Sequence, residues 1–205
     1  MDQPVKKRVR KAKSVRRQEI VEAAVRVMAS HGFHGTSVAR IAKAVGISNS
    51  ALYQHFQNRG EVLAAATDLL GERAREWIIR TGGTTALERL ELIGQGHLKW
   101  SVSSVESFVR PVFALAGASQ GECIEQSTPR TVMLHYDLLV DIVREGQREG
   151  SIRSDVDPGD LAWAILMFAW AEDMALLTNV EEVTTGGASR RNFKLLLAAY
   201  EPTAN

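Results

Sequence analysis

The chain of 205 residues is poor in cysteine and has no long apolar run. Cys123 is its single cysteine, so no disulfide can form within the chain, as is usual for proteins of a reducing compartment. The longest apolar run, residues 161–171, is far shorter than the roughly 20 residues that a membrane-spanning helix needs. No apolar segment of a secretory signal follows the basic N-terminus. We therefore expect a cytoplasmic protein with no membrane partner.

Motifs for catalysis are also missing. The sequence has no glycine-rich phosphate loop, no nucleophile elbow and no cluster of histidines and cysteines at metal-ligand spacing. His97 and His135 are isolated in the sequence, with no neighbouring group that suggests a histidine site. We expect that the protein is not an enzyme and that it holds no cofactor and no metal.

Positive charge is concentrated at the N-terminal end. Residues 1–60 contain twelve lysines and arginines against three acidic residues, a formal charge of +9, whereas the whole chain carries +1. Residues 61–205 therefore carry −8. This polarity is typical of a basic module for a polyanion joined to an acidic body. Residues 1–13 are so uniformly basic that we expect a disordered arm, which either follows the minor groove of DNA or is only a solvated tail.

Residues 37–56 have the apolar spacing of a helix-turn-helix. Buried positions are expected on two short helices that share a core across a tight turn: Val38, Ile41, Val45, Ile47, Leu52 and Phe56. Thr36 or Ser37 can cap the first helix, Gly46 suits its left-handed end, and Ser48 can cap the second helix. The second helix leaves small or hydrogen-bonding side chains outside the core, as a major-groove helix requires. Two helices joined by a glycine turn also occur in α-helical proteins that bind no nucleic acid.

This segment resembles the N-terminal signature of the tetracycline-repressor (TetR) family of bacterial transcription regulators. The resemblance covers about a quarter of the chain, and its main matching pieces are Gly32-Phe33, Thr36-Ser37-Val38, Ile41-Ala42, Gly46-Ile47-Ser48, Ala51-Leu52-Tyr53, His55-Phe56 and Val62-Leu63. Two departures are visible within it. Arg59 stands where the family usually has lysine, and Gly60 stands where an acidic residue is common, which weakens the start of the next helix.

The resemblance implies a DNA-reading helix at about residues 48–55 and suggests the DNA contacts. Thr36 and Ser37 would present hydroxyl and backbone N–H groups to phosphate at a helix N-terminus. Tyr53 would touch the DNA backbone through its hydroxyl group or, alternatively, belong to the core, and Arg59 would serve the same strand as a cation. The candidates for base edges are Asn49, Ser50, Gln54 and His55, preceded by the capping Ser48.

Helix follows helix through the rest of the chain, and no alternating run is long enough for a sheet. We predict an all-α fold, with a three-helix helix-turn-helix domain at residues 14–74 and a larger helical body for effector binding and dimerisation at residues 75–205. Helices are expected at residues 15–31, 59–80, 84–103, 105–118, 129–149, 158–179 and 189–200. Pro111 should break or kink the fourth of these near Arg110.

The segment 158–179 is apolar on every side. One stripe consists of Trp163, Met167, Trp170, Met174 and Leu177, and the opposite one of Ile165, Phe168 and Leu176. A helix without a polar face is buried on two sides, so we expect one side to pack on the body and the other on a second copy of the chain. The final helix would complete this homodimer interface through Phe193, Leu196, Leu197 and Tyr200. The alternative is that all of these residues are internal core.

Large or soft side chains in the body suit a ligand cavity, which in the TetR family lies between such helices. The candidates are Trp77, Trp100, Phe108, Phe113, Met133, Tyr136, Trp163, Met167 and Trp170. Asp173 is a further candidate, because a carboxylate beside aromatic faces favours a cationic ligand. The alternative for Asp173 is an ion pair at the dimer interface or at a helix cap.

Together these features predict a sequence-specific transcriptional regulator. We expect a homodimeric repressor that an unknown small-molecule effector releases from a palindromic double-stranded DNA operator, and that is nucleoid-associated when bound. One alternative is a nucleoid-type protein that coats DNA through the basic arm without reading sequence. The other is a protein-interaction module with a vestigial helix-turn-helix, which would show no DNA affinity at moderate salt.

Overall fold

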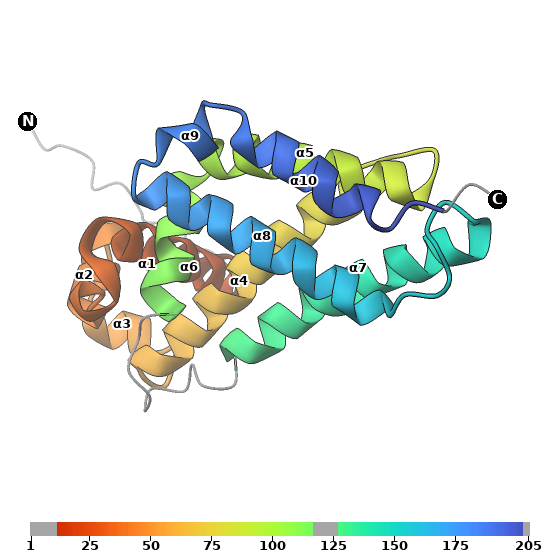
Figure 1. Cartoon of the computed structure of the whole chain (residues 1–205). Coiled ribbons are helices and arrows are strands. Elements are labelled where there is room, and N and C mark those ends of the chain that lie inside the picture. Colours follow the sequence, from red (N-terminus) through yellow and green to blue (C-terminus); the bar gives the residue numbers. More distant parts are fainter. Residues whose placement is uncertain (1–11, 117–126, 203–205) are drawn as a thin grey trace, which may run out of the picture.

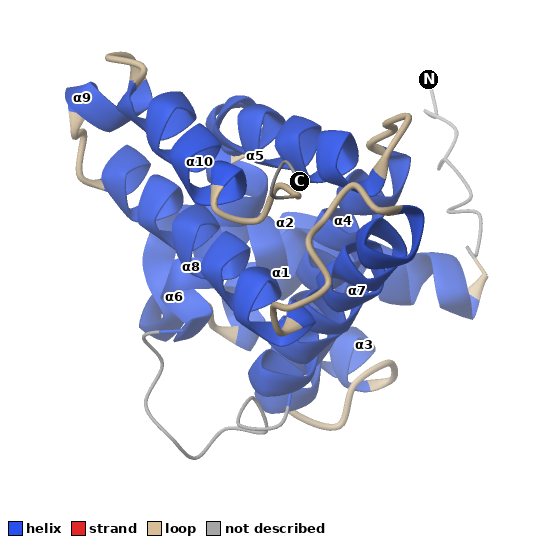
Figure 2. Cartoon of the chain, turned by 45° about the vertical axis from the view of Figure 1, so that its right-hand side comes forward, coloured by secondary structure: helices blue, strands red, loops and turns tan. Residues whose placement is uncertain are grey.

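The computed structural model describes residues 12–116 and 127–202, and within them it contains helices and no strand, as predicted (Figures 1 and 2). Three helices at one end form the head: α1 (Lys13–Gly35), α2 (Val38–Val45) and α3 (Asn49–Tyr53). The long helix α4 (Arg59–Arg80) runs from the head into the body (Figure 1). The body consists of α5 (Ala86–Ser103), the π-helix η1 (Val105–Val109), α6 (Arg110–Ala116), α7 (Ser127–Glu149), α8 (Pro158–Leu177), α9 (Glu181–Thr184) and α10 (Ala188–Ala198). Cys123 and almost all of the predicted arm lie outside the described residues.

Helices α2 and α3 of the head begin at side-chain caps, and α2 also ends at a capping glycine. Ser37 and Ser48 cap α2 and α3 by accepting backbone N–H groups with their hydroxyl oxygens, and Gly46 ends α2 in the left-handed conformation with φ of 72°. Asn58 caps α4 by accepting the N–H group of Glu61 at 2.9 Å. The predicted weakness at the start of α4 is therefore not seen.

Some helix boundaries differ from the predicted ones. The regular turns of α1 are interrupted at Gly32, where φ is 67°, but one further turn follows instead of a loop. The reading helix α3 is shorter than predicted, because the chain leaves it at Gln54 and turns so that Phe56 enters the core. The short helix α9 was not predicted. The predicted break near Arg110 is confirmed: the π-helix η1 gives way to α6 there, one residue before Pro111.

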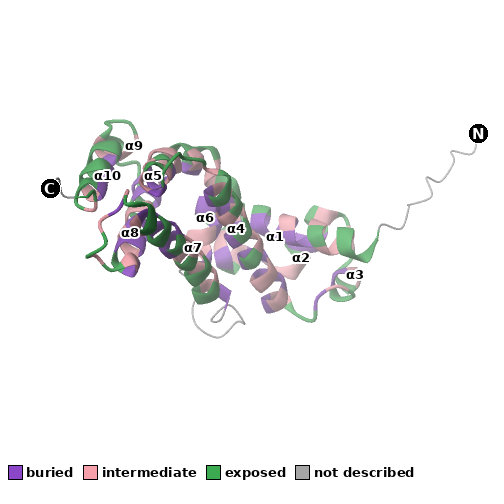
Figure 3. Cartoon of the chain, turned by 90° about the vertical axis from the view of Figure 1, so that its right-hand side faces the viewer, coloured by how far each residue is buried: buried purple, intermediate pink, exposed green. Residues whose placement is uncertain are grey.

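Two core clusters hold the protein together. The first core cluster joins the head, the first half of α4, η1 and α6, and includes Ile20, Leu52 and Val109. The second core cluster lies inside the body between the end of α4, α5, α7, α8 and α10. Helix α6 packs against α1, so the body touches the head at a second place besides α4 (Figure 3).

A polar junction supports this second contact. The guanidinium group of Arg73 on α4 donates to Glu22 Oε2 of α1 at 2.6 Å and to the backbone oxygen of Ser107 in η1 at 3.0 Å. One side chain thus connects the head, the linking helix α4 and the π-helix η1. Movement of any one of these elements must change or break its bonds.

Helix α8 has one buried face and one exposed face, as predicted. The residues of α10 that were predicted to form an interface are not all exposed. Ile165 on the inner face of α8 is buried, whereas Met167, Trp170 and Met174 are 57%, 40% and 47% exposed on its outer face. On α10, Phe193 is 1% exposed and packs in the second core cluster, as does the equally buried Leu197. The predicted role of these two residues in a dimer interface is therefore wrong, because their side chains point into their own chain.

Candidate functional site

The first candidate site is the exposed face of the helix-turn-helix. Leu52 is fully buried and holds α3 on the first core cluster, whereas Ser48, Asn49, Ser50 and Gln54 are exposed. The hydroxyl groups of Ser48 and Ser50 share a hydrogen bond of 2.9 Å. The face that should read DNA is therefore short, polar and open to solvent, as insertion into a major groove requires.

Tyr53 and Phe56 take opposite positions at the end of α3. Phe56 is 2% exposed and belongs to the first core cluster, while the side chain of Tyr53 is 51% exposed. The alternative in which Tyr53 is a core residue is therefore wrong. Tyr53 is therefore open to solvent on α3, as are Asn49 and Ser50.

Thr36 cannot play the predicted role through its hydroxyl group. The residue is fully buried, and its hydroxyl group donates a hydrogen bond of 2.7 Å to the backbone oxygen of Gly32. The prediction that this hydroxyl faces phosphate is wrong, because the turn at the end of α1 uses it internally. Ser37, which is partly exposed, uses its oxygen to accept the N–H group of Arg40 at 3.3 Å.

His55 faces α1 more than it faces solvent. Its Nδ1 atom is buried and has no hydrogen-bond partner among the described residues, and its backbone oxygen accepts a bond from Arg17 at 3.0 Å. Burial, and then the positive charges of Lys13, Arg16 and Arg17, lower the pKa of His55 below its usual value. Because the Nδ1 atom of His55 is buried against the protein, this side chain is less suited to bond to base edges than the exposed side chain of Gln54.

Arg59 binds inside the head. Its Nε atom donates to the backbone oxygen of Thr36 at 2.7 Å, its Nη2 atom donates to that of Phe33 at 2.5 Å, and its guanidinium group lies 4.6 Å from the centre of the Phe33 ring. These contacts join the start of α4 to the end of α1. The arginine in place of the family's usual lysine is explained by this geometry, because only a guanidinium group offers two donors in a planar fork.

Replacement of Arg59 by glutamine should therefore destabilise the head. We expect the free energy of unfolding to fall by about 2 kcal/mol, since two charge-assisted hydrogen bonds to backbone oxygens are lost. Urea denaturation measures this effect, and Arg26→Gln, at an exposed position of α1, is the matched control. A loss of DNA affinity with unchanged stability, and with a salt dependence reduced by about one ion, would instead support the predicted phosphate contact.

Three basic residues near this face contribute to the positive charge of the N-terminal part of the chain, but the sequence predicted no individual role for them. Arg40 and Lys43 are exposed on α2, where they supply positive charge beside the reading helix. Arg17 lies over the Phe56 ring at 4.0 Å and pairs with Glu61 at 3.3 Å, so it holds α1, α3 and α4 together. Helical spacing from Val38 and Ile41 could have placed Arg40 and Lys43 on the solvent face, but the contacts of Arg17 are long-range.

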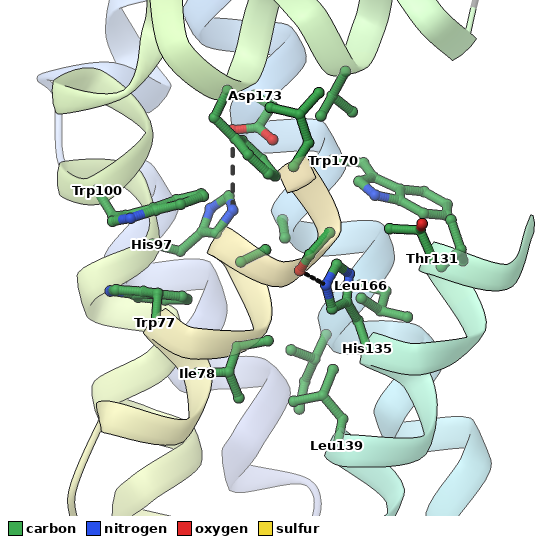
Figure 4. Close-up of a pocket in the computed structure, with 18 of the residues that line it drawn as sticks. Trp77, Ile78, His97, Trp100, Thr131, His135, Leu139, Leu166, Trp170 and Asp173 are labelled. Carbon is green, nitrogen blue, oxygen red and sulfur yellow. Dashed lines mark hydrogen bonds and ion pairs between the residues drawn. The ribbon is translucent and has the colours of Figure 1, made fainter. Parts of the chain in front are cut away.

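The second candidate site is a cavity of about 120 Å³ in the body. Helices α4, α5, α6, α7 and α8 and the π-helix η1 all contribute to its wall, which is mostly apolar and aromatic (Figure 4). The rings of Trp77 and Trp100 stack at 5.3 Å, and Trp100 meets Phe108 edge-on at 4.5 Å. Leu70 of α4 and Leu115 of α6 line the cavity and also belong to the first core cluster, so the cavity adjoins the core of the head.

Half of the ten predicted ligand residues line this cavity: Trp77, Trp100, Phe108, Trp170 and Asp173. The other five lie elsewhere. Tyr136 and Trp163 pack on each other at 4.9 Å in the second core cluster, and Phe113 packs against the first. Met133 and Met167 are exposed at the surface. The sequence identified these residues by their large or soft side chains. Residue type alone does not show which of these side chains line the same cavity.

Two histidines line the cavity, although their isolation in the sequence suggested no site. His97 Nδ1 lies 2.7 Å from Glu172 Oε2, and His135 Nε2 donates to the backbone oxygen of Gly71 at 2.8 Å. Helical spacing carried a usable signal for His97, which is three residues before Trp100 and therefore on the same side of α5. No such signal marked His135.

His135 should make the body sensitive to acid. Burial is the main cause that lowers the pKa of His135 below 6.5, so the unfolded chain binds a proton at this residue more readily than the folded protein does. Stability should therefore fall as the pH drops through about 6.5. We expect His135→Gln to lose less stability between pH 7.5 and pH 5.5 than the original protein in urea denaturation, whereas His34→Gln, at an exposed position, should not differ from it.

The described residues hold no group of three or more His, Cys, Asp or Glu side chains that would suit a metal ion. No helix in the described part of the chain is long and apolar enough to cross a membrane.

A family model described as "Bacterial regulatory proteins, tetR family" matches residues 20–73, which span most of α1, all of α2 and α3, and the first two-thirds of α4. The match therefore covers the face of α3 described above and the first cavity-lining residues of α4, which are Thr67, Leu70 and Gly71.

Individual relatives extend the similarity into the body. The fatty acid metabolism regulator protein of Bacillus subtilis is 26% identical over 152 residues, which cover 72% of this chain and 76% of that protein. The transcriptional repressor KstR2 of Rhodococcus jostii is 28% identical over 151 residues, which cover 71% and 72%. The solved structure of the regulator FadR from B. subtilis, in complex with stearoyl-CoA, has a TM-score of 0.72 at 22% identity and covers 90% of this chain and 99% of that one. At 22% identity, the similarity to this structure shows a shared fold.

Proposed function

We propose that the chain is a member of the TetR family of bacterial transcriptional regulators and, on that premise, that it is a homodimeric repressor that a small molecule releases from a palindromic operator. It is a DNA-binding regulator and not an enzyme. The observation that carries the proposal is the pairing of an open polar face on α3 with an apolar cavity that shares residues with the core of the head. Its place of action would be the bacterial cytoplasm, on the nucleoid when DNA is bound.

For DNA recognition we assign different roles to different residues. Asn49, Ser50 and Gln54 would contact base edges in the major groove, because their side chains are exposed and carry hydrogen-bonding groups. Tyr53 and the backbone N–H groups at the start of α2 would contact phosphates. Arg40 and Lys43 would add attraction that does not depend on the DNA sequence.

For effector response we propose that the cavity acts on the head through α4 and α6 together. The cavity, at about 120 Å³, is smaller than the roughly 300 Å³ at which most ligand sites begin, so an effector of ordinary size must push its walls apart. Leu70 and Leu115 would transmit this movement, and the bonds of Arg73 to α1 and η1 would have to rearrange. Coupling of this kind typically amounts to about 1–3 kcal/mol between effector and DNA binding. The stearoyl-CoA complex of the FadR structure supports a small-molecule effector for this fold.

For dimerisation we propose the outer face of α8. TetR regulators act as dimers, and Met167, Trp170 and Met174 form an exposed apolar stripe there. Leu195, which is 70% exposed on α10, can join this surface in place of Phe193 and Leu197.

Replacement of Met167 by lysine tests the proposed interface. A charge at the centre of an apolar interface should weaken dimerisation by at least about tenfold, because the ammonium group would be buried without a partner. Sedimentation velocity over a range of protein concentrations measures the change. Leu92→Lys, which places the same charge at an exposed position of α5, should leave the dimer intact. If the dimer tolerates Met167→Lys but not Leu92→Lys, the interface does not lie on α8.

The proposed function as a whole is tested by selecting binding sites from random double-stranded DNA at physiological salt. The full-length protein is compared with a variant that lacks residues 1–13. We expect a palindrome from both proteins, with weaker binding when the arm is missing. Uniform recovery of all sequences, lost with the arm, would support the nucleoid-type alternative, and no recovery at all would support a protein-interaction module.

A further inference from the structure

A buried carboxylate faces the cavity without a hydrogen-bond partner at one oxygen. Asp173 of α8 is 3% exposed and lines the cavity, and its Oδ1 atom has no hydrogen-bond partner among the described residues. The buried hydroxyl group of Ser101, on α5, lies close enough to the Asp173 carboxyl group to lower its pKa, but it forms no hydrogen bond of normal geometry among the described residues. Buried polar atoms are nearly always paired in folded proteins, so an unpaired carboxylate oxygen at a cavity wall points to a missing partner.

The neighbouring histidine does not supply that partner. His97 Nε2 lies 4.0 Å from Asp173 Oδ1 (Figure 4), which is within ion-pair distance but too far for a hydrogen bond. Its other nitrogen, Nδ1, is bound to Glu172 Oε2 at 2.7 Å. Glu172 also accepts a hydrogen bond from Ser189. His97 is therefore held by Glu172 through its hydrogen bond, and Asp173 Oδ1 receives no hydrogen bond from it. Burial raises the pKa of the Asp173 carboxyl group, and His97 opposes this rise.

The rest of the wall favours a cation over an anion. No lysine or arginine is found among the described residues that line the cavity. His135 does not replace them, because its Nε2–H group is donated to the backbone oxygen of Gly71 and burial lowers its pKa. Trp77, Trp100 and Phe108 supply aromatic faces, which attract cations electrostatically. A carboxylate or phosphate in this cavity would meet the carboxylate of Asp173 and no lysine or arginine among the described lining residues.

The size of the cavity limits the first group that can enter. Its volume of about 120 Å³ is close to the roughly 150 Å³ of an engineered cavity that binds benzene. A single six-membered ring with a short polar substituent matches this space. A larger effector must displace wall residues, and Trp170 is the most exposed of the labelled aromatic ones (Figure 4).

We propose that Asp173 recognises the effector, and that the effector is an organic cation whose ammonium group bonds to Asp173 Oδ1 while its apolar part lies against Trp77 and Trp100. This inference rests on the proposed function, because only a ligand-responsive repressor has an effector. Binding of an organic cation at Asp173, however, can be tested on the protein without DNA. It distinguishes this chain from the FadR structure, whose ligand is stearoyl-CoA.

The experiment compares three probes of the same shape on DNA-free, full-length protein at pH 7.5. They are cyclohexylmethylamine, cyclohexylmethanol and cyclohexanecarboxylic acid, which are cationic, neutral and anionic at this pH. Binding is measured by isothermal titration calorimetry and by tryptophan fluorescence. We expect the amine to bind at least about tenfold more tightly than the alcohol, and the carboxylate to bind least.

Two variants show whether the preference depends on Asp173. Asp173→Asn keeps the shape of the side chain and should abolish the preference for the amine while binding of the alcohol persists. Asp137→Asn removes the same charge from an exposed position of α7 and should keep the preference. Equal or tighter binding of the carboxylate by the original protein overturns the proposal without any variant, and so does an amine preference that survives in Asp173→Asn.

Release of the selected operator by the amine is measured separately. Amine binding through Asp173 without release from DNA would contradict the proposed effector response and leave the cation site in place. Operator release by the carboxylate alone would contradict the cation site and leave the proposed repressor function in place.

Discussion

Replacement of Gly94 by alanine should lower the free energy of unfolding by about 2 kcal/mol. Gly94 is buried on α5, and a Cβ atom there would overlap the ring of Phe193, which packs against it from α10. Overpacking of a core costs about 1–3 kcal/mol, and the gain in helix propensity offsets less than about 1 kcal/mol of that. Urea denaturation monitored by circular dichroism measures the change.

Two controls accompany this prediction. Gly96→Ala changes the same helix, but there a Cβ atom meets only the edge of the Trp77 ring at 3.3 Å, so the effect should be smaller. Phe193→Leu should partly rescue Gly94→Ala, because the smaller side chain makes room. If Gly94→Ala leaves stability unchanged but weakens the dimer, then Phe193 does serve the interface first predicted from the sequence.

Replacement of both Asn49 and Gln54 by alanine should reduce affinity for the selected operator by about 100-fold. Each residue is exposed on the reading face, and a good contact to a base edge contributes about 1–3 kcal/mol of discrimination. Affinity for unrelated DNA should not change, because phosphate contacts carry it. Fluorescence anisotropy with operator and scrambled duplexes measures both quantities.

The matched control is Lys43→Ala on α2. It should weaken binding to both duplexes alike and reduce the salt dependence by about one ion, without changing the preference between them. If the Asn49 and Gln54 variant instead loses affinity for both duplexes in proportion, these side chains position the protein and the base-reading residues lie elsewhere.

The sequence predicted best those parts of the fold that depend on neighbours along the chain. Helix α4 was expected at residues 59–80 and is found there, because Asn58 caps it and Thr81 follows its last turn. Pro158 begins α8 as expected, with Asp157 as its cap. The same local rules placed Ser48 at the start of the reading helix and Gly46 at the end of the one before it.

Contacts between distant residues were not predictable in this way. Thr36 and Arg59 have the residue types of phosphate contacts, yet both are bound to backbone oxygens at the end of α1, which only the folded head brings near. Phe193 fits the pattern of an interface residue, but its depth is decided by Gly94, about a hundred residues earlier. Whether a tryptophan lines a cavity likewise depends on six helices at once.

Trp170 connects two surfaces that are otherwise separate. It lines the cavity, and its side chain is also 40% exposed on the outer face of α8, where we propose that the second copy packs. An effector that displaces this ring in one protomer therefore also disturbs the interface with the other. Occupation of the two cavities of a dimer would then be interdependent, and the induction curve should have a Hill coefficient different from one. A repressor built in this way would not respond in simple proportion to effector concentration, because the dimer interface couples its two cavities.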